Sequence, residues 1–142
     1  AQITCLDISH EYLKLSQKKK KNFKRINYIQ GGGEKTDFKP GSFDAVFSCF
    51  LFHELPSAVR LELTGEAYRI LKNQGLFGCV DSLQQNDDPE LNWALDQFPI
   101  DFHEPFFKDY THKPLAQIFK KNKFKHIKSE IGFLAKCVTG VK

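Results

Sequence analysis

The run FDAVFSCFLF, residues 43–52, constrains the fold of this chain more than any other feature. It is almost continuously apolar, without the polar alternation of a strand that has one face in water. Such runs are typical of parallel strands covered by helices on both faces. We therefore expect residues 43–52 to form a strand that is buried on both faces.

The segments around this run alternate between predicted strands and predicted helices. Strands are expected at residues 2–8, 25–30, 76–80, 124–130 and 133–141, and helices at 10–22, 57–72, 89–98 and 112–122. Ser9, Ser57 and Thr111 each stand where a helix cap is expected, and Asp88-Pro89 opens the third helix. A Pro- and aromatic-rich loop separates the last two helices. This order predicts βαβ crossovers, a mostly parallel sheet and an antiparallel C-terminal hairpin within one α/β domain, residues 1–142.

Composition excludes several classes of protein. The net charge of +4 comes from lysine-rich runs such as residues 18–21 and 120–125, which are typical of solvated faces, whereas nucleic-acid binding favours arginine forks. The four cysteines lack C-x-x-C spacing, so we expect free thiols and no metal. No apolar run reaches the length of a membrane span and no signal peptide is present, which predicts a cytoplasmic protein.

The segment GGGEKT, residues 31–36, is reminiscent of a phosphate-binding loop. A P-loop requires G-x-x-x-x-G-K-[ST], and its first glycine would fall on Ile29. Glu34 would also place a carboxylate where the anion should bind. These glycines therefore indicate a turn after a strand or a loop for another ligand.

Ligands of parallel α/β sheets bind beyond the carboxyl ends of the strands. That rule selects Asp7, residues 31–34, residues 48–54 and Asp81. Asp7 has the geometry to accept hydrogen bonds from both hydroxyls of a ribose. It is equally suited to stabilise the N-terminus of the next helix.

Two pairs carry possible acid–base chemistry. His53-Glu54 offers a histidine with a carboxylate beside it, suited to a general base, although a polar pair before Pro56 is also typical of a helix start. Tyr68 and Lys72 match the Y-x-x-x-K spacing of short-chain dehydrogenases, without a convincing serine partner.

Three segments together resemble a known family. ITCLDISHEYLKLSQKK, INYIQGGGEKTDFKPGSFDAVFSCFLFHELP and EAYRILKNQGLFGCVDS are similar, in order and spacing, to class I S-adenosylmethionine-dependent methyltransferases. The small-molecule enzymes of ubiquinone and menaquinone biosynthesis form the most similar group. The resemblance covers residues 2–83 and implies a Rossmann-like sheet with helices on both faces.

The resemblance also implies roles for the cofactor-side residues. Asp7 would bind the ribose hydroxyls of S-adenosylmethionine, and Ile8 would pack on its adenine. Gly31, Gly32 and Gly33 match the adenine-side loop, with Gly32 replacing the acid that the family carries there; Glu34 would substitute for that acid, or backbone groups would serve alone. Ser48 and Cys49 would line the methionine end.

The acceptor side follows in the same way. His53 and Glu54 would face the methyl acceptor, joined by His103, Glu104 and Tyr110. Such enzymes act mainly by aligning acceptor, methyl group and sulfur. An oxygen or nitrogen acceptor also needs a base, for which His53 is the candidate. The expected acceptor is a small or medium organic molecule.

The family's first strand and glycine-rich loop would precede residue 1, so we expect a segment of a longer protein that binds S-adenosylmethionine weakly or not at all and whose methyl transfer is impaired. Without that strand, residues 2–8 and 43–52 would either pair with each other or recruit a second copy, giving a homodimer. Two other functions stay open: a non-catalytic interaction domain and a nucleotide-dependent oxidoreductase.

Overall fold

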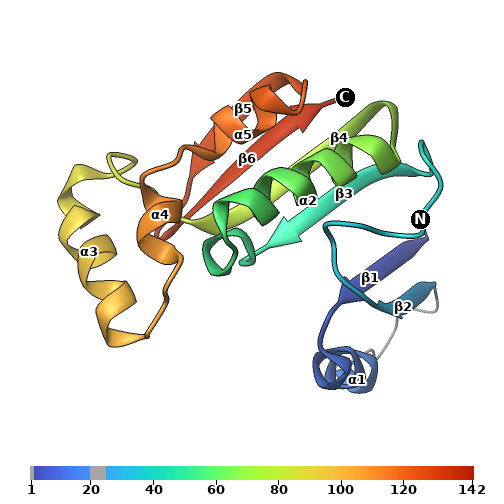
Figure 1. The fold of residues 1–142 in the computed structure, drawn as a ribbon, viewed down its shortest axis with the longest axis horizontal. Helices are drawn as coiled ribbons and strands as arrows, with labels where there is room; N and C mark the ends of the chain where they lie inside the picture. Colours follow the sequence, from blue (N-terminus) through green and yellow to red (C-terminus); the bar gives the residue numbers. More distant parts are fainter. Residues whose placement is uncertain (1, 20–24) are drawn as a thin grey trace. The chain divides into compact units, whose positions relative to one another are not determined.

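A computed structural model describes residues 2–19 and 25–142, which form two compact units, residues 1–37 and 38–142. The elements appear along the chain in Figure 1. They are β1 (Ile3–Asp7), α1 (His10–Lys19), β2 (Ile26–Gln30), β3 (Phe43–Cys49), the 3-10 turn η1 (Phe52–Glu54), α2 (Ser57–Ile70), β4 (Leu71–Ser82), the 3-10 turn η2 (Pro89–Leu91), α3 (Asn92–Asp101), α4 (Phe107–Thr111), α5 (Leu115–Lys121), β5 (Lys125–Ile131) and β6 (Ala135–Val141).

The first unit is a βαβ crossover. Strands β1 and β2 are parallel, in a register that runs from Ile3 opposite Ile26 to Asp7 opposite Gln30. Ser9 caps the helix between them, since its Oγ accepts a hydrogen bond from the backbone N–H of Tyr12 (3.3 Å). The predicted end of this helix, near residue 22, lies outside the described residues.

The second unit contains a mixed sheet in the order β3-β4-β6-β5. Strands β3 and β4 are parallel, whereas β6 is antiparallel to both β4 and β5. The predicted α/β class and terminal hairpin are confirmed, with a larger antiparallel share than expected. Strands β1 and β2 form a separate two-stranded sheet in the first unit.

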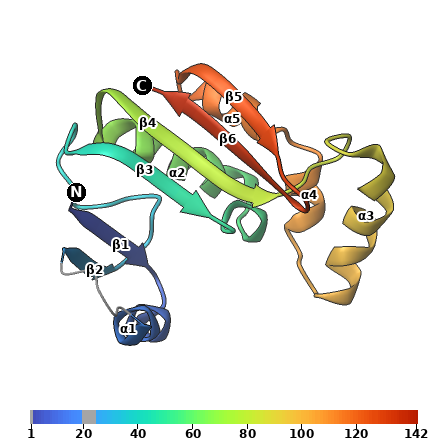
Figure 2. The ribbon, with the colours of Figure 1, turned by 180° about the vertical axis from the view of Figure 1, so that it is seen from behind.

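Helices α2 and α5 lie on the same face of this sheet, as Figures 1 and 2 show from opposite sides. Phe77 of β4 is fully buried there and stacks on Phe119 of α5 with ring centroids 4.8 Å apart. Val138 of β6 and Ala67 of α2 belong to the same core. Burying such rings removes large apolar areas from water and dominates the stability of this unit.

The opposite face of the sheet is open in the described part of the chain. Phe47 of β3 is 66% exposed, and its ring lies over Gly78 of the neighbouring strand, where a Cβ would come within 2.6 Å of it. The expectation that β3 is buried on both faces is therefore wrong. Val46 and Ser48, which alternate with Phe47, lie on the helix side, and Phe43 at the start of the strand also packs against that core.

Helix boundaries differ from the sequence expectation at several places. Asp88 and Pro89 open the 3-10 turn η2, and the third helix, α3, begins only at Asn92. Ser57 is the first helical residue of α2, and the N-cap is Pro56, without a side-chain cap. Thr111 ends α4 and does not cap α5, whose N-cap is Pro114. The predicted aromatic-rich loop is largely helical, since α3 and α4 occupy much of it.

Gln84 ties together the chain that follows β4. Its side chain is buried, and its Nε2 donates to the carbonyls of Tyr110 (2.7 Å) and Lys113 (2.8 Å). Its Oε1 accepts from the backbone N–H of Leu115 (2.9 Å) and from the Lys136 ammonium (3.3 Å). One amide thus fixes the junction between α4 and α5 against β6.

Candidate functional site

The carboxyl ends of β1 and β2 meet, as the crossover requires. The backbone N–H of Gly31 donates to the Asp7 carbonyl (3.0 Å), so the glycine loop begins beside that aspartate. Asp7 Oδ1 accepts from the Ser9 backbone N–H (2.7 Å), and Oδ2 has no hydrogen-bond partner within the described ranges. Ile8 is 76% exposed. A half-exposed carboxylate beside a bare aliphatic side chain fits the ribose and adenine of a nucleoside.

The Glu34 carboxylate lies directly beside Gly32. A Cβ at Gly32 would lie 2.6 Å from both carboxylate oxygens of Glu34. The Glu34 carboxylate therefore occupies the space in which an acidic side chain at position 32 would begin. The loop keeps a negative group at this position, although the glycine carries none.

Ser48 and Cys49, at the end of β3, point to opposite faces of their sheet because side chains alternate along a strand. Ser48 is buried on the helix side, and its Oγ has no hydrogen-bond partner within the described chain. Cys49 is exposed. Their side chains therefore cannot line one wall together.

A fully buried carboxylate organises the ends of β3 and β4. Asp81 Oδ2 accepts from the backbone N–H groups of Leu51 (3.0 Å) and Phe52 (2.7 Å). Its Oδ1 accepts from the Ser82 N–H (2.8 Å) and lies 2.7 Å from His53 Nδ1. Since an ionised carboxylate only accepts, Nδ1 carries the proton in this pair and Nε2 keeps a lone pair when the ring is neutral.

The surroundings of His53 are acidic. Its Nε2 lies 3.9 Å from Glu54 Oε1, and its side chain is 12% exposed. Burial by itself would lower the pKa of His53, but the hydrogen bond to Asp81 and the charges of Asp81, Glu54 and Glu104 outweigh it and raise the pKa above the ordinary value. The imidazole is therefore basic and is held in one orientation.

Aromatic rings enclose this imidazole. The centroids of Phe107, Tyr110 and Phe50 lie 5.8, 6.2 and 6.5 Å from the His53 ring centroid. The Tyr110 hydroxyl donates to the Ser82 carbonyl (2.5 Å), and burial raises the pKa of Tyr110 far above its ordinary value. Tyr110 therefore acts here as a fixed wall and has no role in proton transfer at neutral pH.

The structure thus brings together four of the predicted acceptor-side residues, His53, Glu54, Glu104 and Tyr110. The fifth, His103, has an exposed side chain, which forms no hydrogen bond, ion pair or ring contact with the other four within the described residues. Helix α4 is held against α2 by the ion pair between the fully buried Arg60 and Asp109.

Asp81 and Phe107 belong to the site without having been assigned a role from the sequence. The position of Asp81 at the end of a strand selected it, but its partner is 28 residues away in the chain. Phe107 lies among several aromatic residues in the segment 98–110, and nothing in that pattern distinguishes it.

The dehydrogenase-like pair is not assembled. Lys72 lies in β4, beyond the end of α2, and its ammonium pairs with Asp44 (2.7 Å). The Tyr68 ring packs edge-on against Phe124 (5.2 Å between centroids). The two side chains therefore do not share a helical face, and this hypothesis is wrong.

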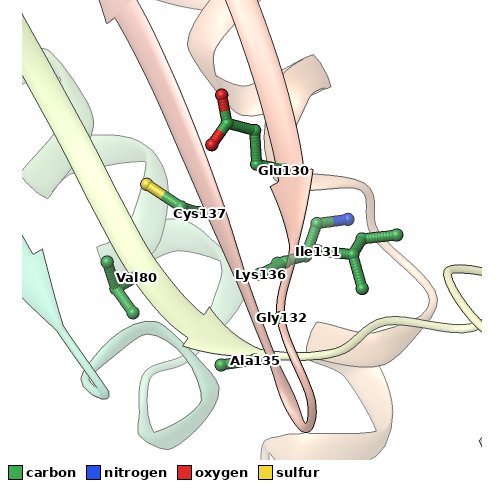
Figure 3. A pocket seen from close by; sticks show the side chains of 7 residues that line it. All are labelled: Val80, Glu130, Ile131, Gly132, Ala135, Lys136 and Cys137. Carbon is green, nitrogen blue, oxygen red and sulfur yellow. The ribbon is translucent and has the colours of Figure 1, made fainter.

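A separate pocket lies on the open face of the sheet, beside the β5–β6 hairpin (Figure 3). Its lining consists of Val80, Glu130, Ile131, Gly132, Ala135, Lys136 and Cys137. Val80 comes from β4, and the others come from the hairpin. The residues of the His53 cluster do not line it.

Comparison with known proteins identifies the family. The model of the methyltransferase domain matches residues 1–79, more than half of the chain. A demethylmenaquinone methyltransferase of Listeria welshimeri is 31% identical over 86 residues, which cover 59% of this chain and 36% of that protein. A ubiquinone/menaquinone biosynthesis C-methyltransferase of Bradyrhizobium is 37% identical over 57 residues, 40% of this chain and 22% of that protein.

Solved structures agree on the fold. Human N-acetylserotonin methyltransferase, in complex with S-adenosylmethionine, matches all of this chain and 41% of its own length, with a TM-score of 0.76 and 16% identity. A SAM-dependent methyltransferase of Methanosarcina mazei matches 99% of this chain and 82% of its own length, with a TM-score of 0.70 and 18% identity.

The chain therefore belongs to the methyltransferase-domain family, within the class I S-adenosylmethionine-dependent methyltransferases. It spans about a third of the length of the demethylmenaquinone methyltransferases that it matches. Within residues 2–19 and 25–142, no helix is long and apolar enough to cross a membrane.

Proposed function

We propose that this domain transfers a methyl group from S-adenosylmethionine to a small or medium organic acceptor, with His53 as the base. The observation that carries the proposal is the 2.7 Å contact between His53 Nδ1 and the buried Asp81 carboxylate. Because Nδ1 is taken by Asp81, Nε2 keeps the lone pair with which it can accept the proton of an acceptor hydroxyl. Asp81 then stabilises the imidazolium that forms when Nε2 takes a proton.

The cofactor residues that we propose lie in both units. Asp7, Ile8, the glycines 31–33 and Glu34 would hold the nucleoside, and the geometry around Asp7 and Gly32 supports this role. Cys49, and Ser48 through its backbone, would lie toward the methionine end. When bound, S-adenosylmethionine supplies an electrophilic methyl group on a sulfonium.

For the acceptor we propose an aromatic hydroxyl compound. The Listeria and Bradyrhizobium relatives are named for menaquinone and ubiquinone biosynthesis. Phe50, whose ring lies 6.5 Å from the His53 ring and is 51% exposed, offers an apolar, flat surface to such a ring. When the hydroxyl transfers its proton to His53 Nε2, negative charge appears on the oxygen and its conjugated ring carbons, and these are the atoms that attack a methyl group.

Two measurements test the proposal. In a thermal-shift assay, S-adenosylmethionine and S-adenosylhomocysteine should raise the melting temperature and NAD should not, because a ligand selective for the native state stabilises it. Methyl transfer to 1,4-naphthalenediol should fall at least tenfold in His53→Ala and stay unchanged in His10→Ala, an exposed histidine of α1. No shift with either S-adenosylmethionine or S-adenosylhomocysteine would favour a non-catalytic interaction domain, and unaltered turnover in His53→Ala would exclude His53 as the base.

We further propose that two copies of the chain associate, since β3 is an outer strand of its four-stranded sheet in the described part of the second unit. Light scattering well above micromolar concentration should give the mass of a dimer, and a monomeric mass would contradict it. A single folded domain and a cytoplasmic location stay predictions.

A further inference from the structure

We propose that His53, Glu54 and Glu104 form a binding site for one divalent transition-metal ion, with Zn²⁺ as the best-fitting ion. One ligand atom from each side chain lies within 4.8 Å of the other two. Zinc bonds of about 2.0–2.2 Å bring ligand atoms to roughly 3–4 Å from each other. Glu54 is exposed, so its side chain has room to change rotamer and shorten these distances.

The histidine is already oriented as a metal ligand. Its Nδ1 is held by Asp81 at 2.7 Å, so Nε2, which lies 3.9 Å from Glu54 Oε1, keeps its lone pair for a metal ion. Asp81 is itself fixed by the backbone N–H groups of Leu51, Phe52 and Ser82. Metal-bound histidines almost always use their second nitrogen in this way, which fixes the ring and strengthens the ligand.

The backbone also fixes where the two glutamates start. Glu54 is the last residue of η1, and its N–H donates to the Leu51 carbonyl (3.1 Å). Glu104 stands in the turn between α3 and α4, where its N–H donates to the Pro99 carbonyl (3.2 Å) and its carbonyl accepts from Phe107 (3.3 Å). The third ligand, Glu104, thus comes from a segment 50 residues further along the chain, and backbone hydrogen bonds hold this segment in place.

The cluster has an excess of negative charge. Among the described residues, neither Glu54 nor Glu104 forms an ion pair with a lysine or an arginine. Three carboxylates, including Asp81, face one imidazole, so the site is anionic even when His53 is protonated. A divalent cation neutralises this excess.

The donor set selects among cations. One imidazole nitrogen and two carboxylate oxygens suit Zn²⁺ and its neighbours in the first transition series better than Mg²⁺ or Ca²⁺, which prefer all-oxygen sites. Three protein ligands also leave coordination positions for water. The sequence-based expectation of no metal considered only cysteine spacing, and this cluster contains no cysteine.

The regulatory consequence rests on the proposed function. A metal ion on Nε2 occupies the lone pair with which His53 would take the proton of the acceptor, so Zn²⁺ should inhibit methyl transfer and a chelator should restore it. Metal binding itself requires neither cofactor nor acceptor, so it is tested separately.

Isothermal titration of the 142-residue chain with Zn²⁺ should give one site per chain. Glu104→Gln and Glu54→Gln each keep the size of the side chain. Each should raise the dissociation constant for Zn²⁺ roughly tenfold or more, because each removes a charged ligand. The control Glu90→Gln changes an exposed glutamate of η2 outside the cluster and should bind as the unaltered chain does. Far-UV circular dichroism checks that all variants fold.

Substitution by Co²⁺ identifies the ligands. Nitrogen and oxygen ligands give only d–d absorption, whereas a thiolate-to-cobalt charge-transfer band would place the ion on cysteine and overturn the proposal. Absence of Zn²⁺ binding, or equal affinity in Glu104→Gln and Glu90→Gln, would overturn it as well. A chain that binds Zn²⁺ through these residues and transfers no methyl group would refute the proposed function alone.

Discussion

Replacing Asp81 by Asn should destabilise the second unit by about 3–6 kcal/mol. The carboxylate accepts four hydrogen bonds, from three backbone N–H groups and from His53. An amide of the same shape has one acceptor oxygen, so its NH₂ group must face two of these donors. Hydrogen bonds to a charged acceptor contribute about 1.5–3 kcal/mol each, and two are lost. Asp81 is fully buried, so water cannot replace them.

Urea unfolding followed by circular dichroism measures this loss as a lower midpoint at constant slope. The matched control is Asp44→Asn, the same chemical change at a carboxylate whose side chain is 87% exposed and pairs with Lys72 on the surface. Its midpoint should stay within error of the unaltered chain. A loss of less than about 1 kcal/mol in Asp81→Asn would refute the reasoning, since it would mean that the amide satisfies the same donors.

Three further predictions concern packing, thiol chemistry and pH. Gly140→Ala should cost about 1–3 kcal/mol in urea unfolding, because its Cβ would lie 2.9–3.0 Å from Phe119 and Phe124 in the core, whereas Gly132→Ala, 3.6 Å from the nearest atom, should cost less than 1 kcal/mol; equal costs would contradict this. Burial, and then the nearby Asp81 charge, raises the pKa of the Cys79 thiol well above its ordinary value, so a disulfide reagent should modify exposed Cys49 in the native chain and Cys79 only after unfolding. For Asp109, the hydrogen bond to Lys113 and the charge of Arg60 outweigh burial and lower the pKa of the carboxyl. The stability that Asp109 contributes is therefore present above about pH 4 and is lost as the pH falls through the lowered pKa. Asp109→Asn should therefore be less stable than the unaltered chain at pH 7 and equal to it near pH 2, and a constant difference would count against the assignment.

The strand pattern of the fold could be predicted because it is local. β1, β2 and the terminal hairpin lie within a residue or two of the expected ranges, since apolar runs bounded by glycine or charge define them. The starts of helices α2 and α5 could not be predicted in this way. Proline occupies both N-cap positions. Ser57 is therefore the first residue of α2, and Thr111 is the last residue of α4.

The sequence did not predict that one face of β3 is exposed, and the reason is different. An apolar run indicates a strand suited to burial, but it does not say which segments cover each face. Phe47 and Val46 are both apolar, yet only Val46 packs against the helix-side core. Side-chain alternation assigns them to opposite faces, and tertiary structure decides which face is covered.

The site was predictable where its residues adjoin in the chain. His53 and Glu54 are neighbours and follow a recognisable strand, so their pairing was visible. The bond from His53 to Asp81 joins the ends of two parallel strands, and Glu104 arrives from the turn between α3 and α4. Contacts of that kind depend on the topology, which a single sequence states only in outline.

The Gln84 amide also has a consequence for local opening. The Leu115 backbone N–H donates to Gln84 Oε1, so this amide hydrogen can exchange with solvent only when that hydrogen bond breaks. That release frees the carbonyls of Tyr110 and Lys113 at the same moment. The start of α5 and the end of α4 should therefore exchange their amide hydrogens as one cooperative unit, at a common rate set by a single side chain.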